Sequence, residues 1–201
     1  MSVLSNPSSL PKFKSEDLVR MPDDGNRYEV IDGELYIHDP THYQHQSACG
    51  HLASALDAWS QSSDLGEANI AVGLVFDDYN SVAPDVVWLS RDRRIEALGQ
   101  DGWLHSAPEL VAEVLIPGEA HFRRDCWIKR ELYARFGVQE YWIVDWQERQ
   151  VDVYRHERDE LCFVKTFRSA DDLNSPLLPG FSCRVESLFF SFPSMSPTIS
   201  F

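Results

Sequence analysis

The sequence predicts a single α/β (α+β) domain, in which helices cover a β-sheet. Two observations support this prediction. Asp32-Gly33 stands between two β-rich segments, which is typical of a tight β-hairpin. The almost wholly apolar run 110–116 indicates a buried strand, and a helical pattern and a further strand follow it. No internal repeat or linker divides the chain, so we expect one domain over residues 14–191, a flexible arm at 1–13 and a flexible tail at 192–201.

The N-terminal half is expected to form a hairpin, a long helix and two strands. Ser15, followed by two acidic residues, is suited to cap a short helix, and Thr41 is suited to cap a long one. In the long helix, apolar residues recur with helical spacing on one face. The expected elements are a short helix from Ser15 to Met21, hairpin strands within 27–38, a helix over 42–62, and strands at 69–77 and 83–89.

The C-terminal half alternates strands with one helix. Pro117-Gly118 ends the buried strand, and Gly137 is a residue type favoured just after a helix. Residues 91–108 are polar and give a weaker signal. The expected elements are a short helix near 95–98, a strand at 110–116, a helix over 122–136, a strand at 138–144, a hairpin from 149–154 and 161–167, and a closing segment at 181–190.

The composition excludes several classes of protein. Hydrophobic residues make up 43% of the chain and aromatic residues 12%, which argues against disorder. No apolar run approaches the ~18 residues that a membrane-spanning helix needs, and the first residues do not resemble a secretory signal. We therefore expect a cytoplasmic protein without a membrane partner. Its four scattered cysteines lack a CxxC pair and are expected to be buried thiols rather than disulfides.

Charge is distributed unevenly along the chain. The formal net charge of −14 argues against a protein that coats nucleic acid by bulk attraction. Residues 120–136, however, contain five basic and two acidic residues, a net charge of +3. A local basic cleft in an acidic protein predicts weak, salt-sensitive and metal-dependent binding of nucleic acid.

Glu113 is the only charged residue in the run Leu110–Ile116. Strand alternation places Val111, Glu113 and Leu115 on one face, opposite Leu110, Ala112 and Val114. An ionised carboxylate in such a strand costs several kcal/mol unless it is paired or binds a metal. Two interpretations remain open, namely a core ion pair with an arginine and a metal ligand.

Asp85 and Lys129 extend the second interpretation. Asp85 begins a neighbouring strand directly after Pro84, so the two acids could meet and bind a divalent cation such as Mg²⁺. Lys129 borders the apolar stripe of the helix over 122–136, formed by Ile128, Leu132 and Phe136. Its amine could enter a cleft beside the sheet, or it could lie at the surface and pair with Asp125.

A series of short blocks along the chain forms a recognisable pattern. The blocks are Tyr28–Leu35, His45-Gln46, Pro84–Val87, Pro108–Leu115, Pro117, Asp125 with Lys129 and Tyr133, Gly137–Asp145 and Leu178–Gly180. Their order resembles that of the PD-(D/E)XK nuclease superfamily and, more closely, that of the Uma-two family of restriction-endonuclease-like domains. The similarity covers roughly residues 15–190 and implies a mixed central sheet flanked by helices, an N-terminal hairpin and additional C-terminal strands.

The resemblance implies a catalytic site. Asp85 and Glu113 would hold Mg²⁺, or Mn²⁺, with the Val114 carbonyl, and Lys129 would assist the attacking water in hydrolysis of DNA. The superfamily name expects a lysine where Leu115 stands, and in the Uma-two family this lysine typically comes from the next helix. Ile116 replaces the usual serine. Candidate supporting or substrate-binding residues are Glu34, His45, Gln46, Arg123, Arg124, Asp125 and Arg130.

Alternative interpretations exist for these features. His38, His42 and His45 lie close together and suggest zinc, although no fourth ligand is evident. Tyr141-Trp142 could stack on bases, but their place in a core strand favours packing. For the whole protein, the leading hypothesis is a metal-dependent DNA endonuclease. The alternatives are a catalytically inactive binding or assembly module, for example a homodimer, and a hydrolase of RNA or another phosphodiester.

Overall fold

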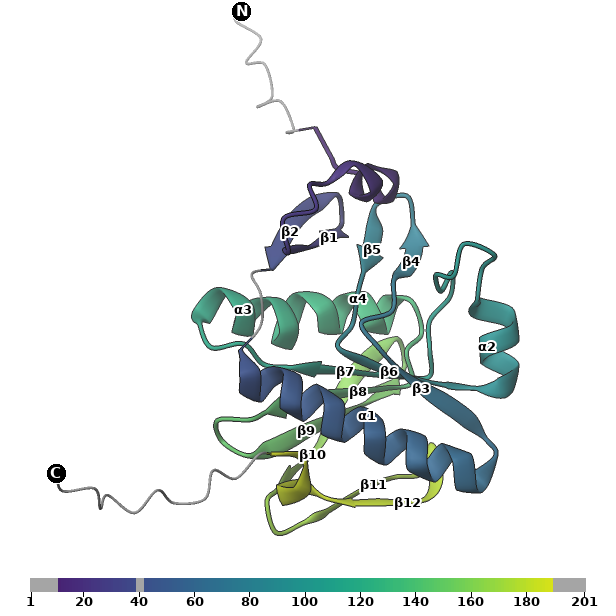
Figure 1. Cartoon of the computed structure of the whole chain (residues 1–201), viewed down its shortest axis with the longest axis vertical. Helices are drawn as coiled ribbons and strands as arrows, with labels where there is room; N and C mark the ends of the chain where they lie inside the picture. Colours follow the sequence, from purple (N-terminus) through teal and green to yellow (C-terminus); the bar gives the residue numbers. More distant parts are fainter. Residues whose placement is uncertain (1–10, 39–41, 190–201) are drawn as a thin grey trace, which may run out of the picture.

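A mixed sheet with the strand order β10-β9-β8-β7-β6-β3 forms the centre of the computed structural model, which describes residues 11–38 and 42–189 (Figure 1). Its strands are β3 (Gly66–Ile70), β6 (Val86–Ser90), β7 (Leu110–Val114), β8 (Glu140–Asp145), β9 (Gln150–Glu157) and β10 (Glu160–Arg168). β7 and β8 run parallel, so the chain between them must cross a face of the sheet. This connection contains α3 (Glu119–Arg123), a π-helical turn (Arg124–Ile128) and α4 (Lys129–Arg135). The predicted mixed α+β architecture is confirmed.

A second sheet, with the order β2-β1-β5-β4, lies on the same side of the central sheet as α4 (Figure 1). It contains β1 (Arg27–Ile31), β2 (Glu34–His38), β4 (Leu74–Asp77) and β5 (Asn80–Val82). The predicted hairpin is confirmed, because Ile31 pairs with Glu34 across a turn in which both Asp32 and Gly33 have positive φ. The opposite face of the central sheet is covered by α1 (Tyr43–Ser63) and by the hairpin of β11 (Asp172–Ser175) and β12 (Leu178–Arg184).

Strand β7 separates the two hydrophobic cores, as its alternation predicts. Leu110, Ala112 and Val114 pack in the core beneath α1, and Val111 packs in the core beneath α4. Glu113 lies on the α4 side, where it accepts hydrogen bonds from that helix. An ionisable side chain thus enters the layer between the two sheets from β7.

Several predicted boundaries were wrong, and turn chemistry explains most of them. The predicted strand at 69–77 is split between β3 and β4, which belong to different sheets, and Ala71 with φ 51° marks the break. The predicted strand at 83–89 begins only at Val86, because Pro84 cannot donate a hydrogen bond to a strand ladder. Ser90 caps α2 (Arg91–Ala97), which starts earlier than the predicted 95–98.

Other differences concern the ends of the elements. His42 is the N-cap of α1, where its ring accepts a hydrogen bond from the Gln44 amide, whereas Thr41 lies outside the described residues. The prediction missed β11, and its closing segment at 181–190 is the end of β12 followed by a 3₁₀ helix, Val185–Leu188. The short N-terminal helix is a 3₁₀ helix, Ser15–Arg20.

Most of the predicted flexible arm and all of the tail lie outside the described residues, which begin at 11 and end at 189. Within the described start of the chain, the Phe13 amide donates a hydrogen bond to the Gly33 carbonyl at 2.9 Å. The four cysteines are free thiols, and three of them are buried as predicted, whereas Cys162 is only partly buried. In the described part of the chain, no helix has both the length and the apolar character that a bilayer crossing needs.

Candidate functional site

Asp85, Glu113 and Lys129 come together between the central sheet and the second sheet, β2-β1-β5-β4, which is called the N-terminal sheet below. Their exposed fractions are 4%, 1% and 0%, so all three polar side chains are buried. Lys129 Nζ donates to Glu113 Oε1 at 2.9 Å, and the amide of Val114 donates to Asp85 Oδ2 at 2.9 Å. Tyr133 Oη also donates to Glu113 Oε1, at 2.7 Å. The two acids therefore flank one peptide group of β7, with the amine beside them.

The π-helical turn before α4 determines where Lys129 points. The Lys129 amide bonds to the carbonyl of Arg124, five residues earlier, instead of the usual four. The wider turn ends just before α4, on which Lys129 and Tyr133, one turn apart, both face Glu113. Of the two predicted placements of Lys129, the structure has the one in which the amine enters the space beside the sheet, and the side chain is fully buried. Its alternative partner Asp125 pairs with Arg124 instead, at 2.8 Å.

A third acid, Glu29 of β1, belongs to the same cluster. It is fully buried, and its Oε1 accepts hydrogen bonds from Lys129 at 3.0 Å and from the Ala83 amide at 2.9 Å. Its Oε2 lies 2.7 Å from His38 Nε2. Lys129 is thus held between two carboxylates that come from different sheets.

The cluster contains three carboxylates, Glu29, Asp85 and Glu113, which contact the cations Lys129 and Arg27. Burial opposes the charged form of Asp85, but His45 at 3.2 Å and Arg27 at 3.2 Å outweigh it and lower the pKa of Asp85. Burial raises the pKa of Glu113 to about 8, and Asp85 and Glu29 add to this effect while Lys129 opposes it. The three carboxylates therefore outnumber the two permanent cations that contact them, and its raised pKa means that Glu113, the surplus carboxylate, is largely protonated at neutral pH when no further cation is bound.

These donors suit a hard divalent cation. Both hydrogen bonds that Glu113 accepts from described residues end on Oε1, so Oε2 remains available. Carboxylate and carbonyl oxygens are the ligands that Mg²⁺ prefers, and a cation would balance the surplus carboxylate. Asp85 also belongs to a group with His45 and Cys49 whose possible ligand atoms lie within 4.8 Å of one another.

Comparison with known proteins identifies the family. The family model described as "Uma2: Putative restriction endonuclease" matches residues 15–186. The chain belongs to the Uma2 family. The resemblance found over roughly residues 15–190 of the sequence is thereby confirmed. No curated protein matches this Uma2 chain.

Solved structures resemble the Uma2 chain in fold. One is a structure from Anabaena variabilis described as a putative nuclease, which is 16% identical, with a TM-score of 0.69 over 88% of this chain and 97% of that one. Another is the type IIG restriction endonuclease BpuSI, with 14% identity and a TM-score of 0.40 over 72% of this chain and 14% of that one. The first supports the restriction-endonuclease-like architecture.

Sequence reasoning missed Glu29, although this Uma2 chain offered a signal. Glu29 stands beside Val30 and Ile31 in a strand, much as Glu113 stands among apolar residues. The prediction selected Glu34 of the same hairpin instead. Glu34 is exposed and accepts a hydrogen bond from Tyr36 at 3.1 Å, away from the cluster.

The structure separates the other predicted supporting residues. His45 contacts Asp85, whereas Gln46 and Arg123 are exposed. Arg124 and Asp125 are buried and form a bidentate pair, with Nε–Oδ1 and Nη2–Oδ2 distances of 2.8 and 3.0 Å. The pair lies within the π-helical turn beside the cluster, since burial would lower the pKa of Arg124 but Asp125, and then Glu29 and Glu113, outweigh burial and raise it.

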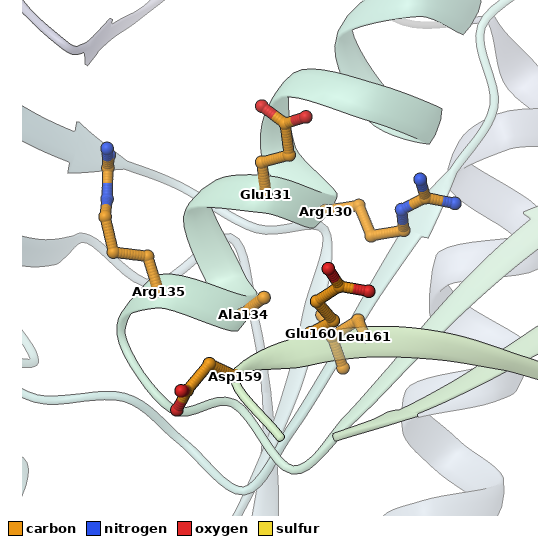
Figure 2. A pocket seen from close by; sticks show the side chains of 7 residues that line it. All are labelled: Arg130, Glu131, Ala134, Arg135, Asp159, Glu160 and Leu161. Atoms are coloured by element: carbon orange, nitrogen blue, oxygen red, sulfur yellow. The ribbon is translucent and has the colours of Figure 1, made fainter. Parts of the chain in front are cut away.

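Arg130 is on another face of α4 and does not belong to the cluster. Its guanidinium is 5.1 Å from the ring centre of Trp127 and 5.2 Å from that of Tyr154. It lines a pocket of about 250 Å³ between α4 and the turn that joins β9 to β10, which Figure 2 shows. Both acidic and basic side chains line this pocket, and none of the three cluster carboxylates does. The lining residues are Arg130, Glu131, Ala134, Arg135, Asp159, Glu160 and Leu161.

The three-histidine zinc hypothesis is not supported by the geometry. His38 contacts Glu29, and His42 caps α1 and stacks on Trp146 with 5.3 Å between ring centres. Among the described residues, the three histidines do not form a common group of metal ligands. Tyr141 and Trp142 are both fully buried, which confirms the packing interpretation over base stacking.

We expect Glu29→Gln to lower the free energy of unfolding by about 2 kcal/mol, because the substitution weakens hydrogen bonds to a charged amine. The pKa of Glu29 lies well below its usual value because Lys129 and His38 outweigh burial, so the charged form is the one that stabilises the fold. Glu34→Gln, on the same hairpin but exposed, should change the unfolding free energy by less than about 0.5 kcal/mol. Urea unfolding of both variants measures this difference, and equal effects would contradict the assigned role of Glu29.

Proposed function

We propose that this Uma2 chain is a metal-dependent endonuclease that hydrolyses DNA phosphodiester bonds. The observation that carries the proposal is the meeting of Asp85, just before β6, Glu113 of β7 and Lys129 of α4 in one buried cluster. A third carboxylate beside two cations must be protonated or bind a further cation, because burial of an unpaired charge is costly, and a metal site gives this carboxylate a role. Family membership supports the same reaction class.

Asp85, Oε2 of Glu113 and the Val114 carbonyl would hold Mg²⁺ or Mn²⁺. When bound, the ion would polarise the scissile phosphate and lower the pKa of water beside it. Arg27 and His45, each 3.2 Å from Asp85, would keep that carboxylate ionised and correctly placed. Residues that contact metal ligands in this way orient them and are needed for full metal affinity.

Lys129 would act as a fixed positive charge. Burial alone would lower its pKa, but Glu113 and Glu29 outweigh burial and raise it, so the amine stays protonated. Glu29 would retain the amine while Glu113 turns toward a metal. An ammonium held in this position offsets the negative charge that develops on the phosphoryl oxygens during hydrolysis.

A pocket of about 500 Å³ provides one route from solvent toward the cluster. It is lined by Arg27, which contacts Asp85, and by Ala83, whose amide bonds to Glu29. Arg27 is the basic residue of this pocket and a candidate for contact with phosphate. We expect binding of nucleic acid to be weak and strongly salt-dependent, because the protein as a whole is acidic.

We expect purified protein to cleave plasmid DNA with Mg²⁺ or Mn²⁺, to lose this activity in a chelator, and to regain it with excess metal. Gel analysis of supercoiled, linear single-stranded and RNA substrates would measure the nucleic-acid preference. Raising the salt from 50 to 200 mM should slow cleavage markedly at limiting substrate. Absence of cleavage on every substrate, together with absence of Mg²⁺ or Mn²⁺ binding by calorimetry, would establish the inactive-module alternative instead.

A further inference from the structure

His45 and Cys49 lie one turn apart on α1, on its buried face. Their exposed fractions are 1% and 2%, and the Cys49 sulfur is 3.6 Å from His45 Nδ1. Side chains four residues apart on a helix are neighbours, which is the spacing that places two metal ligands on one face. Asp85, which is 4% exposed, approaches the other side of the same imidazole.

The imidazole of His45 has an unfulfilled bonding capacity. Its Nε2 lies 3.2 Å from Asp85 Oδ2, but that contact does not have hydrogen-bond geometry, and Nε2 has no hydrogen-bond partner among the described residues. Buried nitrogen atoms of this kind are rare, because an unpaired polar atom is costly to bury. A cation between these side chains would satisfy it.

We propose that His45, Cys49 and Asp85 form a second metal site, which takes a borderline-soft divalent transition-metal ion such as Zn²⁺. Thiolate and imidazole are ligands that Zn²⁺ favours, whereas Mg²⁺ prefers oxygen alone. The unpaired nitrogen is Nε2, whereas the 3.6 Å contact of Cys49 is with Nδ1 of the same ring. One ion bonds to one ring nitrogen, so binding at Nε2 requires the Cys49 side chain to turn toward the Asp85 side of the ring. Ligand atoms of the three residues within 4.8 Å of one another are close enough for such a turn.

When an ion binds at this site, protein ligands replace water on the ion and the protein releases one proton. Cys49 releases its thiol proton to solvent when the sulfur bonds to the ion, while Asp85 and His45 bind through atoms that need not lose a proton. Ligand atoms of the three residues lie within 4.8 Å of one another, so small side-chain rotations bring them to bonding distance. Three protein ligands leave a fourth position for water.

The second site shares Asp85 with the proposed Mg²⁺ site. If the proposed function holds, Zn²⁺ would withdraw Asp85 from Mg²⁺ and inhibit cleavage. This consequence rests on the proposed function, whereas metal binding by His45 and Cys49 does not. The test below therefore measures binding directly and remains informative if the protein cleaves no nucleic acid.

Co²⁺ titration of the full chain provides the test. We expect one Co²⁺ per chain, with the near-ultraviolet absorption that a cobalt–thiolate bond produces, and we expect Zn²⁺ to remove the signal at a far lower concentration than Mg²⁺. Cys49→Ala should abolish this absorption and weaken Zn²⁺ binding at least about tenfold. Loss of a residue that only contacts a metal ligand already weakens metal binding by about that factor, and Cys49 would be a ligand itself. Cys183→Ala, which also removes a buried thiol from the same core, and Cys162→Ser should retain it.

A second measurement uses the unaltered protein, so its result does not depend on whether a variant folds. X-ray absorption at the zinc edge should show one sulfur neighbour at about 2.3 Å together with lighter neighbours at about 2.0 Å. Co²⁺ binding without the thiolate absorption, an unchanged absorption in Cys49→Ala, or a zinc spectrum without sulfur would each overturn the proposal.

Discussion

Glu113→Gln and Asp85→Asn are expected to reduce Mg²⁺-dependent DNA cleavage by about 10²–10³-fold or more. Each substitution removes an anionic metal ligand, and the charge stabilisation that a bound metal supplies is worth several kcal/mol, with one factor of ten for each ~1.4 kcal/mol. Initial rates of plasmid nicking at saturating Mg²⁺ measure the loss. Residual cleavage at the unaltered rate in both variants would exclude the proposed site.

The Glu113 variant should lose activity without losing stability. Burial raises the pKa of Glu113 to about 8, so the fold tolerates a neutral group there, and a glutamine oxygen can still accept from Lys129 and Tyr133. Glu140→Gln is the matched control. Glu140 is equally buried in neighbouring β8, where it pairs with Arg155 at 2.9 Å outside the cluster. We expect its cleavage rate per folded molecule to stay within about twofold of the unaltered protein, since it contacts none of the proposed reacting groups.

The parts of the site that the sequence could predict are those with a local signal. An isolated acid in a seven-residue apolar run identifies Glu113, because burying an unpaired charge is costly wherever the strand lies. The turn at Asp32-Gly33 predicts its hairpin for a similar reason, since positive φ at both positions restricts the residues that fit there. Neither inference requires knowledge of how distant segments pack.

The parts that failed depend on tertiary arrangement. Glu29 joins the cluster only because the N-terminal sheet lies over the central sheet, and hairpin alternation cannot show which face another sheet will cover. The depth of Lys129 depends on a π-helical turn, which a periodicity of 3.6 residues does not represent. The segment 69–77 looks continuous in composition, yet the chain changes sheets within it.

These observations connect the fold to the proposed chemistry. β1, β7 and α4 each contribute one member of the Glu29–Glu113–Lys129 arrangement, so the amine can be positioned only when both sheets and the helix are assembled. Lys129 is therefore expected to contribute both to folding and to catalysis. A substitution of Lys129 tests both contributions.

Lys129→Met is expected to lower the free energy of unfolding by about 3–5 kcal/mol, because it leaves the buried, ionised Glu29 without this cation and Glu113 without a hydrogen-bond donor. Urea unfolding at neutral pH measures the effect. Arg135→Met serves as the control on the same helix. Arg135 is 49% exposed and pairs with Asp32 at 2.8 Å, so its loss should cost at most about 1 kcal/mol.

The double variant Lys129→Met/Glu29→Gln distinguishes an electrostatic loss from a packing loss. Glu29 is the partner that keeps its charge, because its pKa lies well below the usual value, whereas burial raises the pKa of Glu113 to about 8. Removal of the Glu29 charge should restore part of the stability that Lys129→Met loses, with a coupling energy of about 1–3 kcal/mol between the two sites. Additive effects would show that the methionine merely packs badly. Because neither substitution removes a proposed metal ligand, we expect the stabilised double variant to remain inactive for lack of the ammonium, which separates the structural contribution of Lys129 from its proposed role at the phosphate.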